Sequence, residues 1–395
     1  MRAEDFNLSP ILIESEENLA MKFIHTADWH LGKTLKNQSL IEDQKYILQQ
    51  IYNIVDDQKV DAIIIAGDIY DRQVPPEEAV KLFDEVLNEI IVKRKIPLLC
   101  IAGNHDSFNR LNFGSKIFDK SNLYIRAKIT KDIDPIVLND EYGEIYFSLI
   151  PYFEPSHIKK IFELDEKLEL TCDEAGKILV EAARKKIPID KRSVAVAHAF
   201  VIGGKMSGSE RKLPGGLEEV DPSHFSKNFN YTALGHLHGA NVMAKNVRYS
   251  GSLLKYSFDE WKQSKSVTLV EIDGGGNVKF DLIPLKPLRD VKIIRGTIEN
   301  ILENEPETED YISIQYDGAN KPNLNLKLRN KFKNLLEIRS ANKELTTAIE
   351  IERQRQNISD FDLFKNFFKE TTGESMTEEE LKAMENFINE IKGDV

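Results

Sequence analysis

Short apolar runs recur along the chain up to about Pro284, and each is soon followed by glycine or a charged residue. Runs of about four to eight apolar residues with such boundaries are typical of buried β-strands. Apolar residues at helical spacing predict two amphipathic helices, over residues 41–57 and 77–94, and Pro76 suits the first turn of the second. Five apolar runs predict strands at Lys22–Thr26, Ala62–Ala66, Leu98–Ala102, Val194–Ala197 and Tyr231–Leu234.

The order of these elements predicts an α/β protein with one large domain and a smaller one after it. Strand and helix patterns alternate from Met21 to about Pro188, and strands then dominate to about Pro284. Three glycines after Asp273 mark a predicted hairpin between residues 266–272 and 278–283. A second unit begins at Pro287, with a predicted strand over 290–294, a helix over 298–302, a strand over 311–316, and a helix or strand pair over 324–338.

Polar residues that suit a metal site follow the apolar runs directly. The five clusters are Asp28-Trp29-His30, Gly67-Asp68-Ile69-Tyr70-Asp71, Gly103-Asn104-His105-Asp106, the lone His198, and Gly235-His236-Leu237-His238. Carboxylate, imidazole and amide donors without thiolates favour Mn²⁺, Fe²⁺ or Zn²⁺ over softer metals. The carboxyl ends of strands are also where sites in α/β sheets gather. The pattern therefore predicts a hydrolase that uses two metal ions.

Any one cluster alone would more simply be a turn, a helix cap or a buried structural histidine. Five in series, on separate predicted strands, make that interpretation a poor one. Gly67, Gly103 and Gly235 each precede a predicted ligand, as expected where the chain turns sharply and its backbone approaches an ion. The remaining histidines, His25, His157 and His224, are interpreted as structural.

The order of these blocks, DxH, GDxxD, GNHD, a lone His and GHxH, resembles the calcineurin-like metallophosphoesterases. Within that family, residues 25–32, 203–211 and 248–258 look like the SbcD-type nuclease subunits. The resemblance covers nearly the whole chain from Met21 onward. It implies a sandwich of two sheets flanked by helices, and a small capping domain beyond it.

The resemblance also implies which residues act in the site. One metal ion would be held by Asp28, His30, Asp68 and His238, and the other by Asp68, Asn104, His198 and His236. Asp68 would then bridge the two ions, and the oxygen and imidazole donors point to manganese. His105 would be the catalytic residue, facing the scissile phosphate and protonating the leaving alkoxide.

Three residues near these blocks are candidates for supporting roles. Some relatives have a histidine where this chain has Asp71, which we interpret as an acceptor behind the ligands. Arg72 beside it is a candidate phosphate contact, with an ordinary surface pair as the alternative. Asp106 is expected either to orient His105 or to cap the following turn.

The implied domain organisation assigns residues 1–20 to an N-terminal extension and 21–286 to the nuclease domain. Residues 287–339 would form the capping domain, and 340–359 a linker. Residues 360–395 would be a helical segment that binds an SbcC-type coiled-coil ATPase. That segment carries an aromatic stripe, and packing against the chain's own core is the alternative interpretation. The stripe comprises Phe361, Leu363, Phe364, Phe367 and Phe368, and Thr377 with Glu380 forms a predicted capping box.

Composition agrees with a cytoplasmic enzyme. The chain has 395 residues, a formal net charge of −12 and two cysteines, Cys100 and Cys172, which offer no disulfide framework. We find no run of eighteen or more apolar residues and no signal-peptide pattern. The negative charge argues against a protein that simply coats DNA. Bound divalent ions and a DNA-binding partner would offset it.

The expected function is that of an SbcD-type nuclease subunit. Its expected activities are double-strand 3'–5' exonuclease and single-strand or hairpin endonuclease cleavage, in DNA repair, recombination and replication. The expected assembly is a homodimer within a heterotetramer, pairing through residues 41–57, on DNA ends and away from membranes. The alternatives are a small-phosphodiester hydrolase and a non-catalytic DNA tether. A Ser/Thr phosphatase fits less well, because Ala102 precedes a block that ends in Asp106.

Overall fold

The computed structural model describes residues 20–204, 207–208, 219–317, 324–340, 361, 365, 368 and 376–384. The chain divides into two compact units. The larger unit runs to Ile293 and includes Glu309–Ile312, and the smaller comprises the rest of the chain after Ile293.

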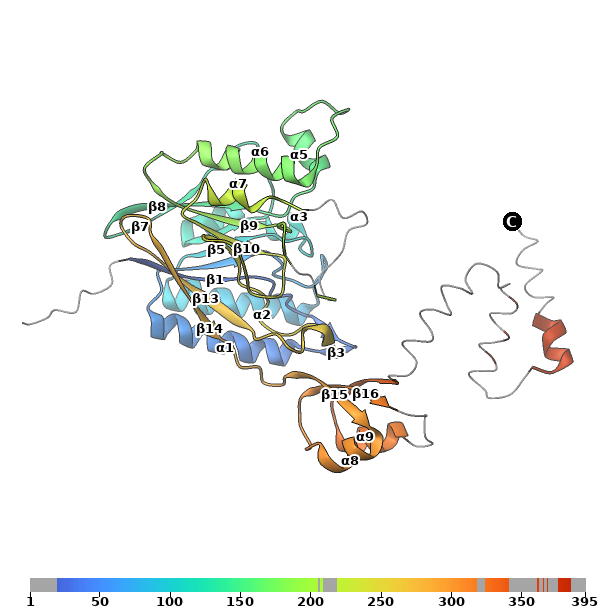
Figure 1. Cartoon of the computed structure of the whole chain (residues 1–395). Coiled ribbons are helices and arrows are strands. Elements are labelled where there is room, and N and C mark those ends of the chain that lie inside the picture. The colour runs from blue at the N-terminus through green and yellow to red at the C-terminus, as the bar shows by residue number, and fades with distance from the viewer. Residues whose placement is uncertain are drawn as a thin grey trace, which may run out of the picture. The chain divides into compact units, whose positions relative to one another are not determined.

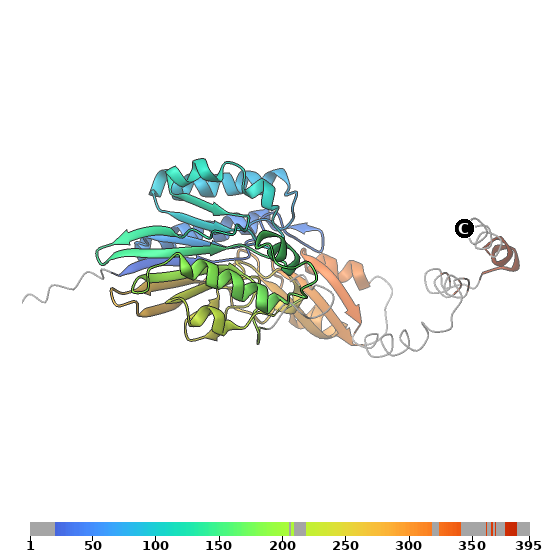
Figure 2. The same ribbon diagram turned by 90° about the horizontal axis from the view of Figure 1, so that it is seen from above.

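Among the residues that the structure describes, two six-stranded sheets form the framework of the larger unit (Figures 1 and 2). The first sheet has the order β14 (Val278–Pro284), β13 (Ser266–Ile272), β1 (Met21–Thr26), β4 (Ala62–Ala66), β5 (Leu98–Ile101) and β6 (Leu123–Arg126). The second has the order β11 (Asn241–Ala244), β12 (Val247–Tyr249), β10 (Tyr231–Gly235), β9 (Arg192–His198), β8 (Gly143–Ile150) and β7 (Ile136–Asp140). The two-sheet α/β sandwich expected from the resemblance is confirmed.

Parallel strands occupy the centre of each sheet. In the first sheet β1, β4, β5 and β6 are parallel neighbours. In the second sheet β8, β9, β10 and β12 are parallel neighbours. Antiparallel strands flank both groups, including the predicted hairpin of β13 and β14. Parallel neighbours end at the same edge of a sheet, so the segments that follow them are brought together.

The alternation of side chains along β9 shows how both faces of the second sheet are buried. Val194 and Val196 belong to the core between the sheets, together with Phe23 and Phe147. Ala195 and Ala197, on the opposite face of the strand, belong to a second core beneath the outer helices. Because side chains alternate between faces, a strand buried on both faces is apolar throughout, which is why the sequence pattern revealed it. Phe23 meets Phe147 edge-on, with ring centroids 5.7 Å apart.

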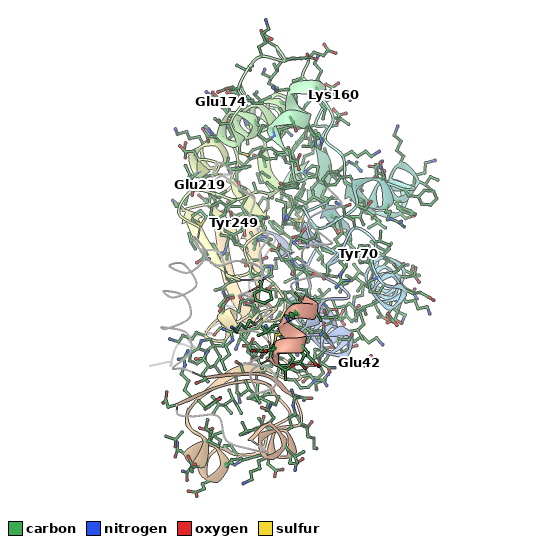
Figure 3. The ribbon with its side chains drawn as sticks, turned by 90° about the vertical axis from the view of Figure 1, so that its right-hand side faces the viewer. Glu42, Tyr70, Lys160, Glu174, Glu219 and Tyr249 are labelled. Atoms are coloured by element: carbon green, nitrogen blue, oxygen red, sulfur yellow. The ribbon has the colours of Figure 1, made fainter. Side chains whose placement is uncertain are left out.

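Helices cover the outer face of each sheet, as Figures 1 and 2 show. The helices beside the first sheet are α1 (Ile41–Gln58) and α2 (Glu77–Leu87), which continues as the π-helix η1 (Asn88–Arg94). Those beside the second are α5 (Pro155–Ile161), α6 (Cys172–Lys185) and α7 (Pro222–Ser226). Figure 3 labels Glu42 in the first turn of α1 and Glu174 in that of α6, on the two outer layers. The two helices predicted before residue 95 are confirmed.

The predicted pairing surface on α1 is polar on its outer side. The helix buries Ile47, Leu48, Ile51 and Val55 in the chain's own core. Among its large apolar side chains, only Tyr46 is exposed, at 43%. The proposal that residues 41–57 pair two copies therefore stays a prediction, and it would depend on polar contacts and Tyr46.

Short elements connect the strands. They are the hairpin of β2 (Thr34–Leu35) and β3 (Gln38–Ser39), the helices α3 (Phe108–Leu111) and α4 (Ser115–Phe118), and the 3₁₀ turns η2 (Asp119–Ser121) and η3 (Phe258–Glu260). Elements this short lack a hydrophobic period, so the sequence pattern did not predict them. None of the described helices combines the length and the hydrophobicity that crossing a lipid bilayer requires.

The smaller unit contains most of a three-stranded sheet in the order β15 (Val291–Thr297), β16 (Tyr311–Asp317) and β17 (Leu335–Ser340). Its helices are α8 (Ile298–Asn304) and α9 (Leu324–Lys331). The predicted strand–helix–strand order is confirmed, and the ambiguous last segment is a helix followed by a strand. Thr297 caps α8 by accepting a hydrogen bond from the backbone N–H of Asn300 at 3.3 Å.

Several predictions concern residues outside the described part of the chain. Among them are the N-terminal extension up to residue 19, the linker after Ser340, and Leu363, Phe364 and Phe367 of the aromatic stripe. The capping box is confirmed: the Thr377 hydroxyl accepts from the Glu380 backbone N–H at 3.3 Å, and the Glu380 carboxylate accepts from the Thr377 N–H at 2.8 Å.

Candidate metal centre

Backbone hydrogen bonds hold the segments after β1 and β4 side by side. The N–H of Asp28 donates to the carbonyl of Gly67 at 3.0 Å, and that of His30 donates to the carbonyl of Asp68 at 2.9 Å. These bonds continue the pairing of the two strands past their ends. The predicted ligands that follow each strand are therefore held at fixed positions relative to one another.

Four predicted ligands have a backbone conformation that is rare for residues other than glycine. The φ angles are 52° for Asp28, 44° for His30, 51° for Asp68 and 111° for His236. Left-handed backbone of this kind is unfavourable for L-residues, and it clusters at functional sites where the surrounding structure enforces it. The concentration of such residues at the strand ends marks this place as a functional site.

Glycine before a predicted ligand allows a very close approach of two segments. A Cβ atom at Gly103 would lie 2.1 Å from the Asp68 carboxylate and 2.4 Å from its backbone nitrogen. One at Gly67 would lie 2.2 Å from Nδ1 of His198. The sequence interpretation of these glycines as sites of close backbone approach agrees with this geometry.

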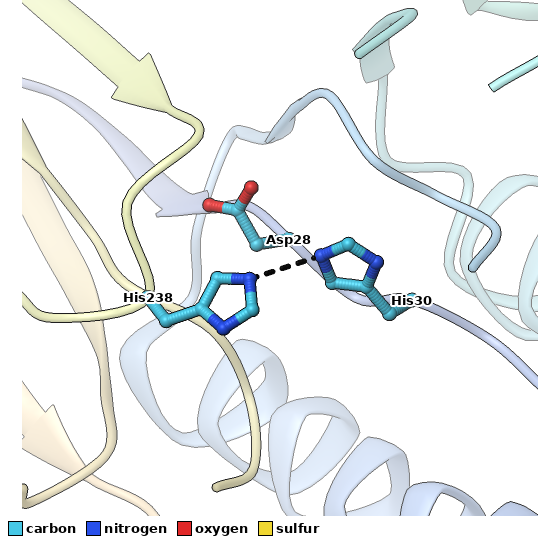
Figure 4. Close-up of side chains that lie close together, drawn as sticks. All are labelled: Asp28, His30 and His238. Carbon is cyan, nitrogen blue, oxygen red and sulfur yellow. Dashed lines mark hydrogen bonds between the residues drawn. The ribbon is translucent and has the colours of Figure 1, made fainter. Parts of the chain in front are cut away.

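One group of side chains consists of Asp28, His30 and His238 (Figure 4). All three are buried, and their donor atoms lie close enough to share an ion. Nε2 of His30 lies 3.1 Å from Nε2 of His238. The Asp28 carboxylate also accepts from the backbone N–H of His236, at 2.9 and 3.1 Å. This contact joins the segment after β1 of the first sheet to the segment after β10 of the second.

A second group gathers around Asn104. Its side-chain oxygen lies 3.0 Å from Nε2 of His198 and 3.2 Å from Nδ1 of His236. The other ring nitrogen of His236 is buried and has no hydrogen-bond partner among described residues. A buried nitrogen without a partner is unfavourable unless an ion or solvent satisfies it.

Asp68 lies between the two groups. Its Oδ2 is 3.6 Å from Nε2 of His30 and 3.5 Å from Nε2 of His198, while Oδ1 accepts from the backbone N–H of His105 at 2.8 Å. Burial raises the pKa of this carboxyl, but the neighbouring rings of His198, His30 and His105 outweigh burial and lower the pKa to about 2. Asp68 is therefore ionised at neutral pH.

Burial keeps the nearby imidazoles neutral. It lowers the pKa of His30 to about 4, although the nearby Asp71 carboxylate opposes the shift, and it lowers the pKa of His236 to about 3. Neutral imidazole is the form that binds metals, through the nitrogen that lacks a proton. The imidazole lone pairs and the ionised carboxylate together fit divalent ions of intermediate hardness.

His105 lies at the edge of this cluster and is partly exposed. Its Nδ1 donates to the backbone carbonyl of Asp71 at 2.9 Å. Its ring meets that of His30 edge-on, with centroids 4.7 Å apart. The Nδ1 bond fixes the ring, so that Nε2 is the atom available to a bound molecule.

The expectation that Asp106 orients His105 or caps the next turn is wrong. Its buried carboxylate accepts instead from the backbone N–H groups of Ile69 at 3.1 Å, Tyr70 at 2.9 Å and Gly103 at 2.9 Å. Burial and the nearby charge of Asp68 raise the pKa of Asp106 to about 7. Asp106 thus ties the two segments after β4 and β5 together, because those backbone donors have no strand partner there.

Asp71 lies behind His30, as an acceptor behind the ligands would. Its Oδ1 is 3.6 Å from Nδ1 of His30 and 2.7 Å from the ammonium of Lys33. Burial alone would raise the pKa of Asp71, but His30 and Lys33 lower it below its usual value. The Arg72 side chain is 67% exposed, and its Nε lies 3.6 Å from Asp71. Arg72 is therefore accessible to a molecule in solvent while it pairs with Asp71.

The other histidines lie away from the cluster's donor atoms. His25 bonds the Tyr231 hydroxyl at 2.9 Å and the Leu234 carbonyl at 3.1 Å. His224 bonds Asp173 at 2.9 Å, and His157 is exposed on α5. The contacts of His25 and His224 agree with the structural roles that the sequence predicted for them.

The sequence analysis missed three residues that support the cluster. Gln44 of α1 donates to the His30 carbonyl at 2.8 Å, and Glu260 lies 3.0 Å from Nδ1 of His238, with Lys265 behind it. None belongs to a recognisable motif. Gln44 lies on the long helix α1 and Glu260 on a 3₁₀ turn, and a polar residue on such an element normally indicates only a solvated face.

Two family profiles match the chain. A profile described as calcineurin-like phosphoesterase matches residues 21–240. Another, described as type 5 capsule protein repressor C-terminal domain, matches residues 287–372. The first covers more than half of the chain and includes every predicted ligand. It defines the class as that of the metal-dependent phosphodiesterases.

Two relatives align over nearly the full chain, and both are named as the D subunit of the nuclease SbcCD. The protein of Staphylococcus epidermidis is 33% identical over 94% of this chain and 100% of its own length. That of Staphylococcus saprophyticus is 35% identical over 93% of this chain and 98% of its own. The chain therefore belongs to the calcineurin-like phosphoesterases and, within them, to the family of the SbcCD nuclease D subunits.

A likeness to solved structures is much weaker. The crystal structure of TT1561 of Thermus thermophilus aligns over 67% of this chain and 99% of its own, at 12% identity and a TM-score of 0.38. A TM-score this low does not bear on the details of the site.

Proposed function

We propose that this chain is the nuclease subunit of an SbcC–SbcD-type complex. Its reactions would be double-strand 3'–5' exonuclease and single-strand or hairpin endonuclease cleavage, in DNA repair, recombination and replication. The printed name of two relatives that align over nearly the whole chain supports a nuclease subunit. The observation that carries the proposal is the position of Asp68, which lies 3.6 Å from His30 and 3.5 Å from His198.

The proposed ligand scheme divides the cluster at this carboxylate. One ion would be held by Asp28, His30, Asp68 and His238, and the other by Asp68, Asn104, His198 and His236. Asp68 would belong to both sets, because its Oδ2 faces one histidine of each. Two bound divalent ions, manganese in this proposal, supply Lewis-acid stabilisation of the phosphodiester and a water of lowered pKa.

His105 would act on the leaving oxygen. Its Nδ1–H donates to the Asp71 carbonyl, which holds the ring with Nε2 on the other side. A proton on Nε2 can then pass to the departing alkoxide. The ring's place beside His30 puts this proton next to the ligand cluster.

Three further residues would support the reaction from beside the cluster. Asp71 would act on His30 by charge, since its carboxylate lies 3.6 Å from Nδ1, and Lys33 would balance the charge of that carboxylate. Arg72 would contact a DNA phosphate. Its side chain is mostly exposed, and its Nε lies 3.6 Å from Asp71, which places it beside the cluster. Arginine suits this role because its planar group binds phosphate with two hydrogen bonds.

The test of the nuclease proposal compares the wild type with His105→Ala in manganese, on linear double-stranded DNA and on bis-p-nitrophenyl phosphate. His157→Ala is the control, because that histidine is exposed on α5, away from the cluster. We expect loss of DNA cleavage in His105→Ala and full activity in His157→Ala. Cleavage of only the small ester by the wild type would favour a small-phosphodiester hydrolase. DNA binding without any cleavage would favour a non-catalytic tether.

We also propose a partner, an SbcC-type coiled-coil ATPase bound through residues 360–395, in a heterotetramer with two copies of this chain. The relatives' printed name, which makes them one subunit of SbcCD, supports a complex. Residues 287–339 would cap the site and select DNA ends. Removing residues 341–395, after the end of β17, should leave hydrolysis of the small ester intact and abolish ATP-dependent DNA cleavage. Unchanged DNA processing would contradict the partner.

A further inference from the structure

Behind His238 lies a buried carboxylate that neither the motifs nor the proposed ligand scheme includes. Glu260, the last residue of η3, has no solvent exposure. Its Oε1 lies 3.0 Å from Nδ1 of His238. A carboxylate at this distance accepts a hydrogen bond, so Nδ1 of His238 is the nitrogen that carries the proton.

Lys265 balances the charge of this carboxylate. Its ammonium donates to Oε2 of Glu260 at 2.6 Å, to the backbone carbonyl of His238 at 2.8 Å and to Ser252 Oγ at 2.8 Å. Lys265 is only 7% exposed, so the two charges form a buried pair. The same lysine thus fixes both the carboxylate behind the ring and the backbone that carries it.

The carboxylate has further donors that hold its orientation. The backbone N–H of Tyr256 donates to Oε2 at 3.3 Å, and the Ser207 hydroxyl donates to Oε1 at 3.2 Å. Each oxygen therefore has at least two donors. Burying a charged pair costs desolvation energy, so such a pair adds little to the stability of the fold. A role at the candidate centre explains its place beside the His238 ring better.

We propose that Glu260, held by Lys265, is a positioning residue that sets the tautomer and the ring orientation of His238. With the proton at Nδ1, the lone pair is at Nε2, the atom that lies 3.1 Å from Nε2 of His30 (Figure 4). An acceptor on the far nitrogen fixes a ligand ring and raises its basicity toward the ion. The inference rests on the proposed metal centre, since it assigns His238 as a ligand.

Other rings of the cluster have weaker acceptors in the same position. Nδ1 of His198 donates to the Ala66 carbonyl at 2.9 Å, and Nδ1 of His30 lies 3.6 Å from the Asp71 carboxylate. Only His238, among the described histidines of the cluster, has a carboxylate within 3.0 Å of its far nitrogen. Loss of Glu260 should therefore weaken one ion site, the one with His238, and spare the other.

The first test measures manganese binding by electron paramagnetic resonance of the free ion, on the full-length protein. Glu260→Gln keeps the shape of the side chain and removes its charge. We expect one of two binding events to weaken by about 10- to 100-fold, as for other residues behind metal ligands. The control is Asp140→Asn, which breaks a buried pair elsewhere, where Arg192 donates to Asp140 at 2.7 Å. The control should lose stability and keep both affinities.

Equal manganese affinities in Glu260→Gln and the wild type would overturn the proposal. Absence of manganese binding by the wild type would instead contradict the proposed function itself. The second test applies even if the variant does not fold. Nitrogen-15 NMR of labelled histidines in the metal-free wild type should find the proton of His238 at Nδ1, assigned by its loss in His238→Gln. A proton at Nε2 would overturn the proposal.

Discussion

The Nε2 atoms of His30 and His238 face each other at 3.1 Å in the buried interior of the candidate centre. Each ring has an acidic side chain near its other nitrogen, Asp71 at 3.6 Å and Glu260 at 3.0 Å. With its proton held at Nδ1 by Glu260, as proposed, His238 has a lone pair at Nε2, and the contact between the two Nε2 atoms is a hydrogen bond whose proton comes from His30. A divalent ion bound by both rings would replace this hydrogen bond.

Metal binding should stabilise the protein against unfolding. A ligand that binds only the native state adds about 2.7 kcal/mol to the free energy of unfolding at a free concentration of 100 times its Kd. We expect manganese to raise the thermal midpoint of the wild type, measured by differential scanning fluorimetry. In His238→Gln the increase should be smaller. An equal increase in that variant would show that the ion binds elsewhere.

Gly103→Ala should disrupt the centre. The new Cβ would lie 2.1 Å from the Asp68 carboxylate, so the carboxylate or the segment after β5 must move. Inserting a methyl group into a packed site costs about 1 to 3 kcal/mol. We expect that loss in urea unfolding, together with loss of manganese binding. Gly275→Ala, in the β13–β14 turn where the closest atom would lie at 3.3 Å, is the control and should bind normally.

Asp106→Asn should separate the segments that this carboxylate joins. Asparagine presents one oxygen and one amide donor to three backbone N–H groups, so at least one donor loses its partner. A buried donor left unsatisfied costs about 1 to 3 kcal/mol. We expect faster hydrogen exchange at the amides of Ile69, Tyr70 and Gly103 in the variant. Unchanged exchange there would contradict the role assigned to Asp106.

His25 should make the stability of the metal-free protein depend on pH. Burial lowers the pKa of His25 from 6.5 to about 3, so between these values the unfolded chain binds a proton that the native protein does not. Stability therefore falls as the pH is lowered through this window. For this residue alone the loss from pH 7.5 to 5 is about 2 kcal/mol.

The comparison that isolates this contribution is the slope of unfolding free energy against pH. His30 and His236 act in the same direction and Asp106, whose pKa is raised, acts in the opposite one. Those contributions are common to both proteins when the wild type is compared with His25→Gln. We expect a shallower slope in His25→Gln and no change in His157→Gln. Parallel slopes for all three would contradict the buried neutral state of His25.

The sequence predicted the framework of the fold because that framework is periodic. The parallel strands are buried on both faces, so they appear as continuous apolar runs, and the polar residues after them stand out. Strand direction predicts that Asp28 and Asp68 lie at one edge of the first sheet, whereas the grouping with His198, which ends β9 of the second sheet, was implied only by the family resemblance.

What the sequence did not predict depends on contacts between loops. Asp106 binds backbone amides of residues 69 and 70, which are far from it in sequence and come near only when β4 and β5 pair. Glu260 reaches His238 through a 3₁₀ turn, which has no hydrophobic period to reveal its direction. Such contacts are set by tertiary packing, and residue type alone does not predict them.

The central claim is that Asp68 bridges two ions. The most direct measurement is a crystal structure of the manganese-loaded protein with anomalous scattering data. We predict two manganese peaks on opposite sides of the Asp68 carboxylate, one beside His30 and His238 and the other beside Asn104 and His198. A single peak, or peaks that do not contact Asp68, would contradict the account.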